Sequence, residues 1–134
     1  MASDLLVGVA GVVCRDGKYL LGSQVGGVLE GSWSFPWNLV SEGDFEPRNY
    51  VSPTVFSCTG LEVKTKDFID IVDAKLGKED LKILFYGCEY VCGEPKAVSE
   101  RFSEWGWFFP DKLPKKVFGP VGYFFERVGE AKWI

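Results

Sequence analysis

The sequence predicts one α+β domain that is rich in β-strands. Its 134 residues are enough for a single domain with an ordinary hydrophobic core. Short apolar runs separated by glycine-rich or charged turns fill most of the chain, which is typical of strands. Helical spacing of apolar residues occurs in two places only, in the centre and near the C-terminal end. We therefore expect a compact domain over residues 1–134 in which strands predominate.

The predicted strands follow one another from the N-terminus. The apolar runs 5–13 and 18–22 are joined through Asp16-Gly17, and Asp-Gly between such runs favours a tight hairpin. A glycine-rich loop is expected over 24–32. Four further runs look like strands: SWSFPWNLV from Ser32, LEVKTKDFIDIVDAKL from Leu61, LKILFYGCEYVCGEP from Leu81 and WGWFFP from Trp105.

The central segment favours a helix that contains a proline. Val51, Val55 and Cys58 recur on one helical face, and Gly60 suits the residue after a helix. Pro53 conflicts with an unbroken helix, whereas Ser52-Pro53 is a good N-cap and first residue. We expect either a short helix beginning at Ser52 or a longer one kinked there. A second helix is predicted over GPVGYFFERVGEAKW, whose apolar residues Val121, Phe124, Phe125 and Val128 have helical spacing.

Composition excludes several classes of function. A net charge of −4 argues against general nucleic-acid binding, and no stretch approaches the ~20 apolar residues that span a bilayer. The absence of histidine excludes histidine-based catalysis and histidine-liganded metals. Asp4, without a basic flank, favours a first strand over a signal peptide. The four cysteines are interpreted as small buried hydrophobic residues in a reducing compartment, so we expect a cytoplasmic protein.

Several phrases, taken in order, resemble the Nudix (MutT-like) family along nearly the whole chain. They are VGVAGVV with DGKYLLG, GSWSFP, V-x-x-G-D, TGLEV and ILFYGCEYVCGEPKAVSERFSEWGWFFPDKLP. The resemblance implies the Nudix fold, an α/β/α sandwich around a mixed β-sheet. It also implies a signature of form GX5EX7REUXEEXGU, where U is apolar. In the family its glutamates hold divalent metals against the pyrophosphate of a nucleoside diphosphate linked to another group.

The signature is degenerate in this chain. Its two loop glycines fall on Trp37 and Asn38, and its first glutamate falls on Asp44. With one extra residue before the helix, the Arg-Glu pair falls on Pro53 and Thr54, the paired glutamates on Ser57 and Cys58, the apolar positions on Val55 and Leu61, and the closing glycine on Gly60. No Asp or Glu occurs from residue 47 through 61. The packing positions are kept and the ligands are missing, which predicts loss of metal-dependent hydrolysis.

Four acids outside the helix could still form a weakened site. Glu42 and Asp44 are candidate metal ligands in the loop before the helix. Glu100 and Glu104 are candidate catalytic residues, because many Nudix enzymes place a further glutamate in this segment. Mg²⁺ or Mn²⁺ is implied only if such residual activity exists. The alternative is that all four are solvated surface charges.

Aromatic residues are the candidate ligand-binding groups. Trp33, Phe35 and Trp37 alternate and would share one face of a regular strand, and Trp105 lies in a second aromatic run. Stacked rings could hold a nucleobase, at ~1–3 kcal/mol per base. Core packing is the alternative, and Trp37 could also occupy part of the metal site.

Three functions remain open from the sequence. The first is a binding or regulatory domain that holds a nucleotide-like small molecule without cleaving it. The second is a divergent hydrolase of nucleoside diphosphate compounds with a rebuilt metal site. The third is a protein-interaction module that uses exposed aromatic residues. We expect a monomer or a homodimer.

Overall fold

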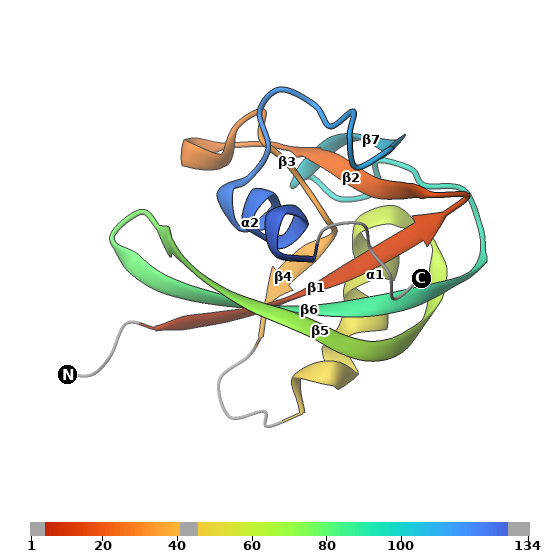
Figure 1. Ribbon diagram of the computed structural model, residues 1–134, viewed down its shortest axis with the longest axis horizontal. Helices are drawn as coiled ribbons and strands as arrows, with labels where there is room; N and C mark the ends of the chain where they lie inside the picture. The colour runs from red at the N-terminus through yellow and green to blue at the C-terminus, as the bar shows by residue number, and fades with distance from the viewer. Residues whose placement is uncertain (1–4, 41–45, 129–134) are drawn as a thin grey trace.

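A mixed sheet forms the centre of the molecule (Figure 1). The computed structural model describes residues 5–40 and 46–128. Strand β1 runs parallel to β6 and antiparallel to β2 and β4, and the remaining pairs are antiparallel. The main path of the sheet is β3-β2-β1-β6-β5, with β4 on β1 and β7 on β2. The strands are β1 Leu6–Arg15, β2 Lys18–Gln24, β3 Trp33–Ser34, β4 Trp37–Leu39, β5 Glu62–Leu76, β6 Glu79–Cys92 and β7 Phe102–Phe108.

The predicted Asp-Gly hairpin is confirmed. Arg15 pairs with Lys18, so only Asp16 and Gly17 form the turn between β1 and β2. Both have positive φ, 56° and 80°, as a type I′ turn requires. The long hairpin of β5 and β6 also closes through two residues, but only the first of them, Gly77 at φ 65°, has positive φ.

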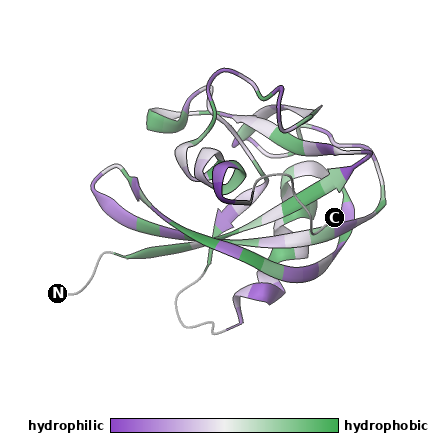
Figure 2. Cartoon of the chain, in the orientation of Figure 1, coloured by the Kyte–Doolittle hydropathy of each residue, from purple (hydrophilic) through white to green (hydrophobic). Residues whose placement is uncertain are grey.

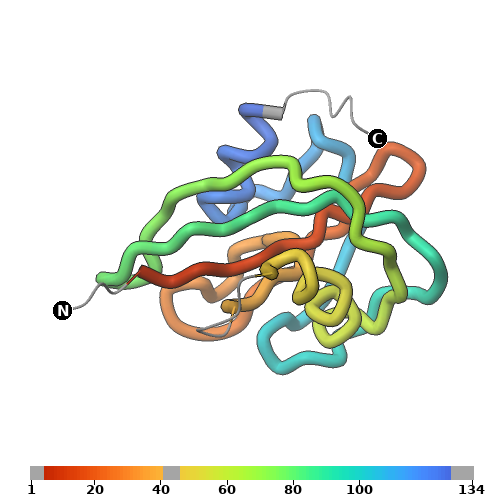
Figure 3. Tube along the Cα trace, turned by 90° about the horizontal axis from the view of Figure 1, so that it is seen from below, coloured from red at the N-terminus to blue at the C-terminus, as the bar shows by residue number. Residues whose placement is uncertain are grey.

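Two helices cover the sheet, α1 Val51–Thr59 and α2 Gly119–Val128. Alternate residues of β1 point to different core clusters: Val9 and Val13 pack with α1, whereas Ala10 and Val12 pack with α2. The helices therefore lie on opposite faces of β1, as the view from below also shows (Figure 3). Apolar residues predominate in β1, which runs between them, whereas β5 mixes apolar and hydrophilic residues (Figure 2). This arrangement confirms the predicted α+β class and the α/β/α sandwich.

The run 32–40 is not one strand, contrary to the prediction. It divides at Phe35-Pro36, where β3 leaves β2 and β4 joins β1. The carbonyl of Pro36 accepts a hydrogen bond from the Gly11 amide at 3.0 Å, which fixes the crossing. Because the strand is interrupted, Trp33 and Trp37 belong to different strand pairs and do not share a regular face.

The central helix also differs from both expected forms. A 3-10 turn, η2 Pro47–Tyr50, leads directly into α1, which begins at Val51 rather than Ser52. Pro53 is tolerated because it lies in the first turn, where amides have no partner within the helix. Gly60 ends the helix at φ 82°, as predicted. Helix α2 confirms the second prediction as far as Val128. In the part of the chain that the structure describes, no helix is long and apolar enough to cross a membrane.

Candidate functional site

Helix α1 sits directly on β1 because residue 11 has no side chain. A Cβ at Gly11 would lie 2.4 Å from Cγ2 of Val55, which is closer than atoms tolerate. Val51, Val55 and Leu61 have no exposed surface. Gly11 and these buried apolar residues, of which Val55 and Leu61 are signature positions, thus hold the helix on the sheet.

The positions of the missing glutamates carry small neutral side chains. Thr54 and Cys58 are buried, at 6% and 1% exposure, and Ser57 is exposed. The Ser57 hydroxyl donates to the carbonyl of Thr54 at 3.1 Å, within its own helix. The Cys58 thiol faces the carbonyl of Trp37, with a sulfur–oxygen distance of 3.9 Å. No group here carries negative charge.

Trp37, which stands where the family has a glycine, is 2% exposed and tightly held. Its ring stacks on Phe118 with centroids 5.6 Å apart and an interplanar angle of 24°. Its Nε1 donates to Oε1 of Gln24 at 2.8 Å. The indole therefore fills buried space beside Phe118 and Gln24 that a glycine would leave free.

A cation that the sequence analysis did not single out completes this cluster. Nη1 of Arg101 lies 4.0 Å from Sγ of Cys58. The guanidinium carbon lies 5.4 Å from the ring centroid of Trp37 and 5.3 Å from that of Phe102. We call Trp37, Cys58 and Arg101 the Arg101 site. Arg101 lies between Glu100 and Glu104 in sequence, so the sequence analysis singled out this segment for its acids and not for its arginine.

Burial raises the pKa of the Cys58 thiol, and this outweighs the lowering effect of the nearby Arg101. The ordinary value is already well above neutrality. Cys58 is therefore a neutral thiol at pH 7 and does not balance the charge of Arg101.

The predicted aromatic residues do not form one pocket. Phe35 has no exposed surface and packs on Phe85 and Phe124, so core packing accounts for it. Trp33 is half-buried against Phe108, with centroids 5.2 Å apart. Trp105 packs on Phe102 at 4.4 Å, and its buried Nε1 has no hydrogen-bond partner among the described residues. Of these four predicted aromatic residues, Trp37 is the one whose ring lies under the Arg101 guanidinium.

The predicted acids are placed as follows. Glu104 is exposed on β7 opposite Ser23, and Glu100 is exposed in the turn before that strand. Neither forms an ion pair within the described residues. Glu42 and Asp44 lie outside the described residues. The catalytic and metal assignments of these four acids stay predictions.

The residues at the signature positions do not fit the divalent metal that the family implies. Mg²⁺ needs carboxylate oxygens, and Thr54, Ser57 and Cys58 supply hydroxyls and a neutral thiol. A guanidinium beside them would repel a second cation. Within residues 5–40 and 46–128, no group of three Cys, Asp or Glu residues could hold a metal ion.

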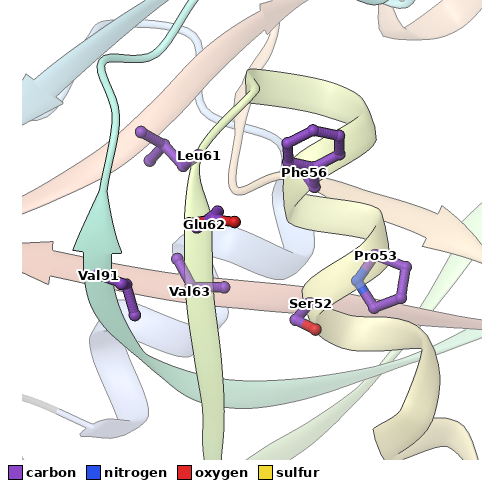
Figure 4. A pocket seen from close by; sticks show the side chains of 7 residues that line it. All are labelled: Ser52, Pro53, Phe56, Leu61, Glu62, Val63 and Val91. Carbon is purple, nitrogen blue, oxygen red and sulfur yellow. The ribbon is translucent and has the colours of Figure 1, made fainter.

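A separate groove of about 450 Å³ lies between the exposed side of α1 and β5 (Figure 4). Phe56 and Pro53 come from the helix, and Glu62 from the facing strand. The Glu62 carboxylate accepts a hydrogen bond from Sγ of Cys92 at 3.0 Å. The groove is lined by Ser52, Pro53, Phe56, Leu61, Glu62, Val63 and Val91, none of which belongs to the Arg101 site.

Solved structures that share this arrangement of helices and strands include MutT and Nudix proteins. A MutT Nudix hydrolase from Burkholderia pseudomallei is 25% identical, with a TM-score of 0.83 over 92% of this chain and 98% of that one. A MutT protein from Methanosarcina mazei Go1 is 20% identical, with a TM-score of 0.84 over 95% and 94%. An ADP-ribose pyrophosphatase from Streptococcus suis is 20% identical, with a TM-score of 0.69 over 86% and 81%.

Sequence comparison alone does not reach this result. No family model matches the chain, and no curated protein matches it. The apolar positions and the closing glycine of the signature are present, and the carboxylates of its helix are replaced. By its fold, the chain belongs to the Nudix (MutT-like) superfamily, with a degenerate signature on α1.

Proposed function

We propose that this protein binds a nucleotide-like ligand and does not hydrolyse it. One observation carries the proposal: Cys58, at the position of a paired glutamate, is a buried neutral thiol beside the guanidinium of Arg101. Metal-assisted hydrolysis requires a cation that both neutralises two phosphates and activates a water molecule. An arginine supplies charge but no exchangeable water.

The retained architecture supports binding rather than a purely vestigial fold. Arg101 is half-buried and held on aromatic rings, an arrangement that places a cation at low entropic cost. A protein-interaction role through the predicted aromatic residues would need them exposed, and Phe35 and Trp37 are buried.

Phosphorus NMR tests the proposal. The protein is incubated with nucleoside triphosphates, ADP-ribose, NAD and dinucleoside polyphosphates in excess Mg²⁺ or Mn²⁺. We expect no new monophosphate resonances, and selective broadening of the compound that binds. Metal-dependent products that disappear in Glu104→Gln or Asp44→Asn would refute the proposal and establish a hydrolase with a rebuilt site.

A further inference from the structure

We infer that the guanidinium of Arg101 replaces the metal cation, so that this site binds a diphosphate group without a divalent metal. The inference rests on the proposed function and specifies both the ligand class and its chemistry of recognition. It concerns one cluster, the Arg101 site together with the ring of Phe102.

The location of the positive charge is the first argument. In the family, the carboxylates of this helix concentrate positive charge, as metal ions, next to the ligand phosphates. Here the helix position of a paired glutamate is Cys58, and Nη1 of Arg101 lies 4.0 Å from its sulfur. The same sulfur faces the Trp37 carbonyl at the loop-glycine position. Positive charge therefore lies at the same place as in the family, but a guanidinium carries it instead of a metal ion.

The second argument is that no ion pair among the described residues balances this charge. The ion pairs of the described residues use Arg15, Lys66, Lys75, Lys82 and Arg127 as their cations, and Arg101 is not among them. Cys58 is neutral. The rings of Trp37 and Phe102 attract a cation but accept no conventional hydrogen bonds.

The unused donors of Arg101 define the ligand. A guanidinium has five N–H donors in a planar fork, and among the described residues the side-chain acceptor found for it is the sulfur of Cys58 at 4.0 Å. The fork matches two oxygens of a phosphate, and paired charges strengthen such bonds. A half-buried position strengthens the attraction further, because screening by water is reduced.

The main chain holds the arginine in position. The carbonyl of Arg101 accepts a hydrogen bond from the Val25 amide at 2.9 Å, and its amide donates to Oγ of Ser99 at 3.1 Å. These bonds fix the start of β7 against the end of β2. The side chain thus starts from a fixed point, which lowers the entropy that binding must remove.

The test uses inorganic pyrophosphate as the probe, with the intact protein in EDTA. Isothermal titration calorimetry gives its affinity with and without added Mg²⁺. We expect saturable one-site binding in EDTA that Mg²⁺ does not strengthen. Arg101→Met should weaken it at least about tenfold, as loss of a charged hydrogen bond does. Arg101→Lys keeps the charge but not the fork, so it should fall between the two.

Lys78→Met is the matched control, since it removes one exposed positive charge in the turn between β5 and β6. It should leave the affinity within about twofold, because exposed distant charges are screened. Circular dichroism confirms that each variant is folded. If Arg101→Met does not fold, Arg101→Lys and the wild-type comparison in EDTA still decide.

Three results would overturn the inference: no pyrophosphate binding, binding that requires Mg²⁺, or equal affinity in folded Arg101→Met. None of these would by itself restore hydrolysis, so the proposed function is tested separately. Parallel phosphorus NMR of ADP-ribose with Mg²⁺ makes that distinction, because only failure of the proposed function yields products there.

Discussion

The two sides of α1 differ in how far they match the family signature. The side that faces β1 keeps Val55 at an apolar position of the family signature, and this residue lies close to Gly11 of β1. The side that should carry acids has Thr54, Ser57 and Cys58, with Trp37 and Arg101 packed near the last of these. The comparison teaches that the fold depends on shape at the sheet and not on the catalytic carboxylates.

The largest expected loss of stability comes from replacing Trp37, which packs near the side of α1 that lacks the acids. Trp37→Ala should lower the free energy of unfolding by about 3–5 kcal/mol, because it removes a buried ring and leaves a cavity. Urea denaturation measures this. Trp37→Phe should cost less, since it keeps a ring against Phe118 and loses only the bond to Gln24 and some volume. A loss below about 1 kcal/mol for Trp37→Ala would mean that the indole has no structural role.

The β1-facing side can be broken by adding one carbon. Gly11→Ala should destabilise the protein by about 1–3 kcal/mol, because its Cβ would overlap Val55. Thermal unfolding followed by circular dichroism gives the shift. In a Val55→Ala background the same substitution should cost less, so the pair should be non-additive. Additive effects would show that α1 does not pack against Gly11 as described.

The alkaline limit of stability reports on the same side. Burial raises the pKa of the Cys88 thiol to about 12, and Cys88 lies in the core cluster of α1. The unfolded thiol ionises near pH 8.5, so stability is full below that pH and falls as pH rises toward 12, by up to about 1.4 kcal/mol per unit. Urea titrations at several pH values should show a shallower decline for Cys88→Ala. An unchanged slope would place the thiol in contact with water.

The smallest expected effect is a gain in stability, at Gly122. Gly122 lies inside α2, and a Cβ there would meet nothing within 4 Å. Gly122→Ala should raise the free energy of unfolding by about 0.4–1 kcal/mol, because alanine restricts the unfolded chain and favours a helix. Thermal unfolding checks this. Together with Gly11→Ala, it separates a glycine needed for packing from one that is not. Destabilisation would indicate a close neighbour at that position.

Local chemistry made much of the fold predictable. The Asp16-Gly17 turn and the Gly60 helix end depend on positive φ angles that few residue types adopt. These residues therefore predict the turn and the helix end directly from the sequence. The division of the run 32–40 could not be foreseen from alternation, because it depends on which strands Trp33 and Trp37 join. Pro36 was the local signal, since proline is rare within regular strands.

The candidate site was predictable only in part. The sequence shows directly that α1 lacks acids, and a tryptophan at a loop-glycine position predicts that Trp37 occupies part of the metal site. The role of Arg101 depends on a contact across 43 positions, which no local pattern encodes. Phe35 shows the reverse difficulty, because an aromatic residue in a core and one in a binding site look alike in sequence.

Manganese binding, followed by the electron paramagnetic resonance signal of free Mn²⁺, tests the central claim most directly, because it needs no knowledge of the ligand. We predict that the free signal rises in proportion to added metal, with no saturable site on the protein. Loss of that signal up to one equivalent per chain, reversed by Asp44→Asn or Glu104→Gln, would contradict the account. It would show that acids outside α1 have rebuilt a metal centre.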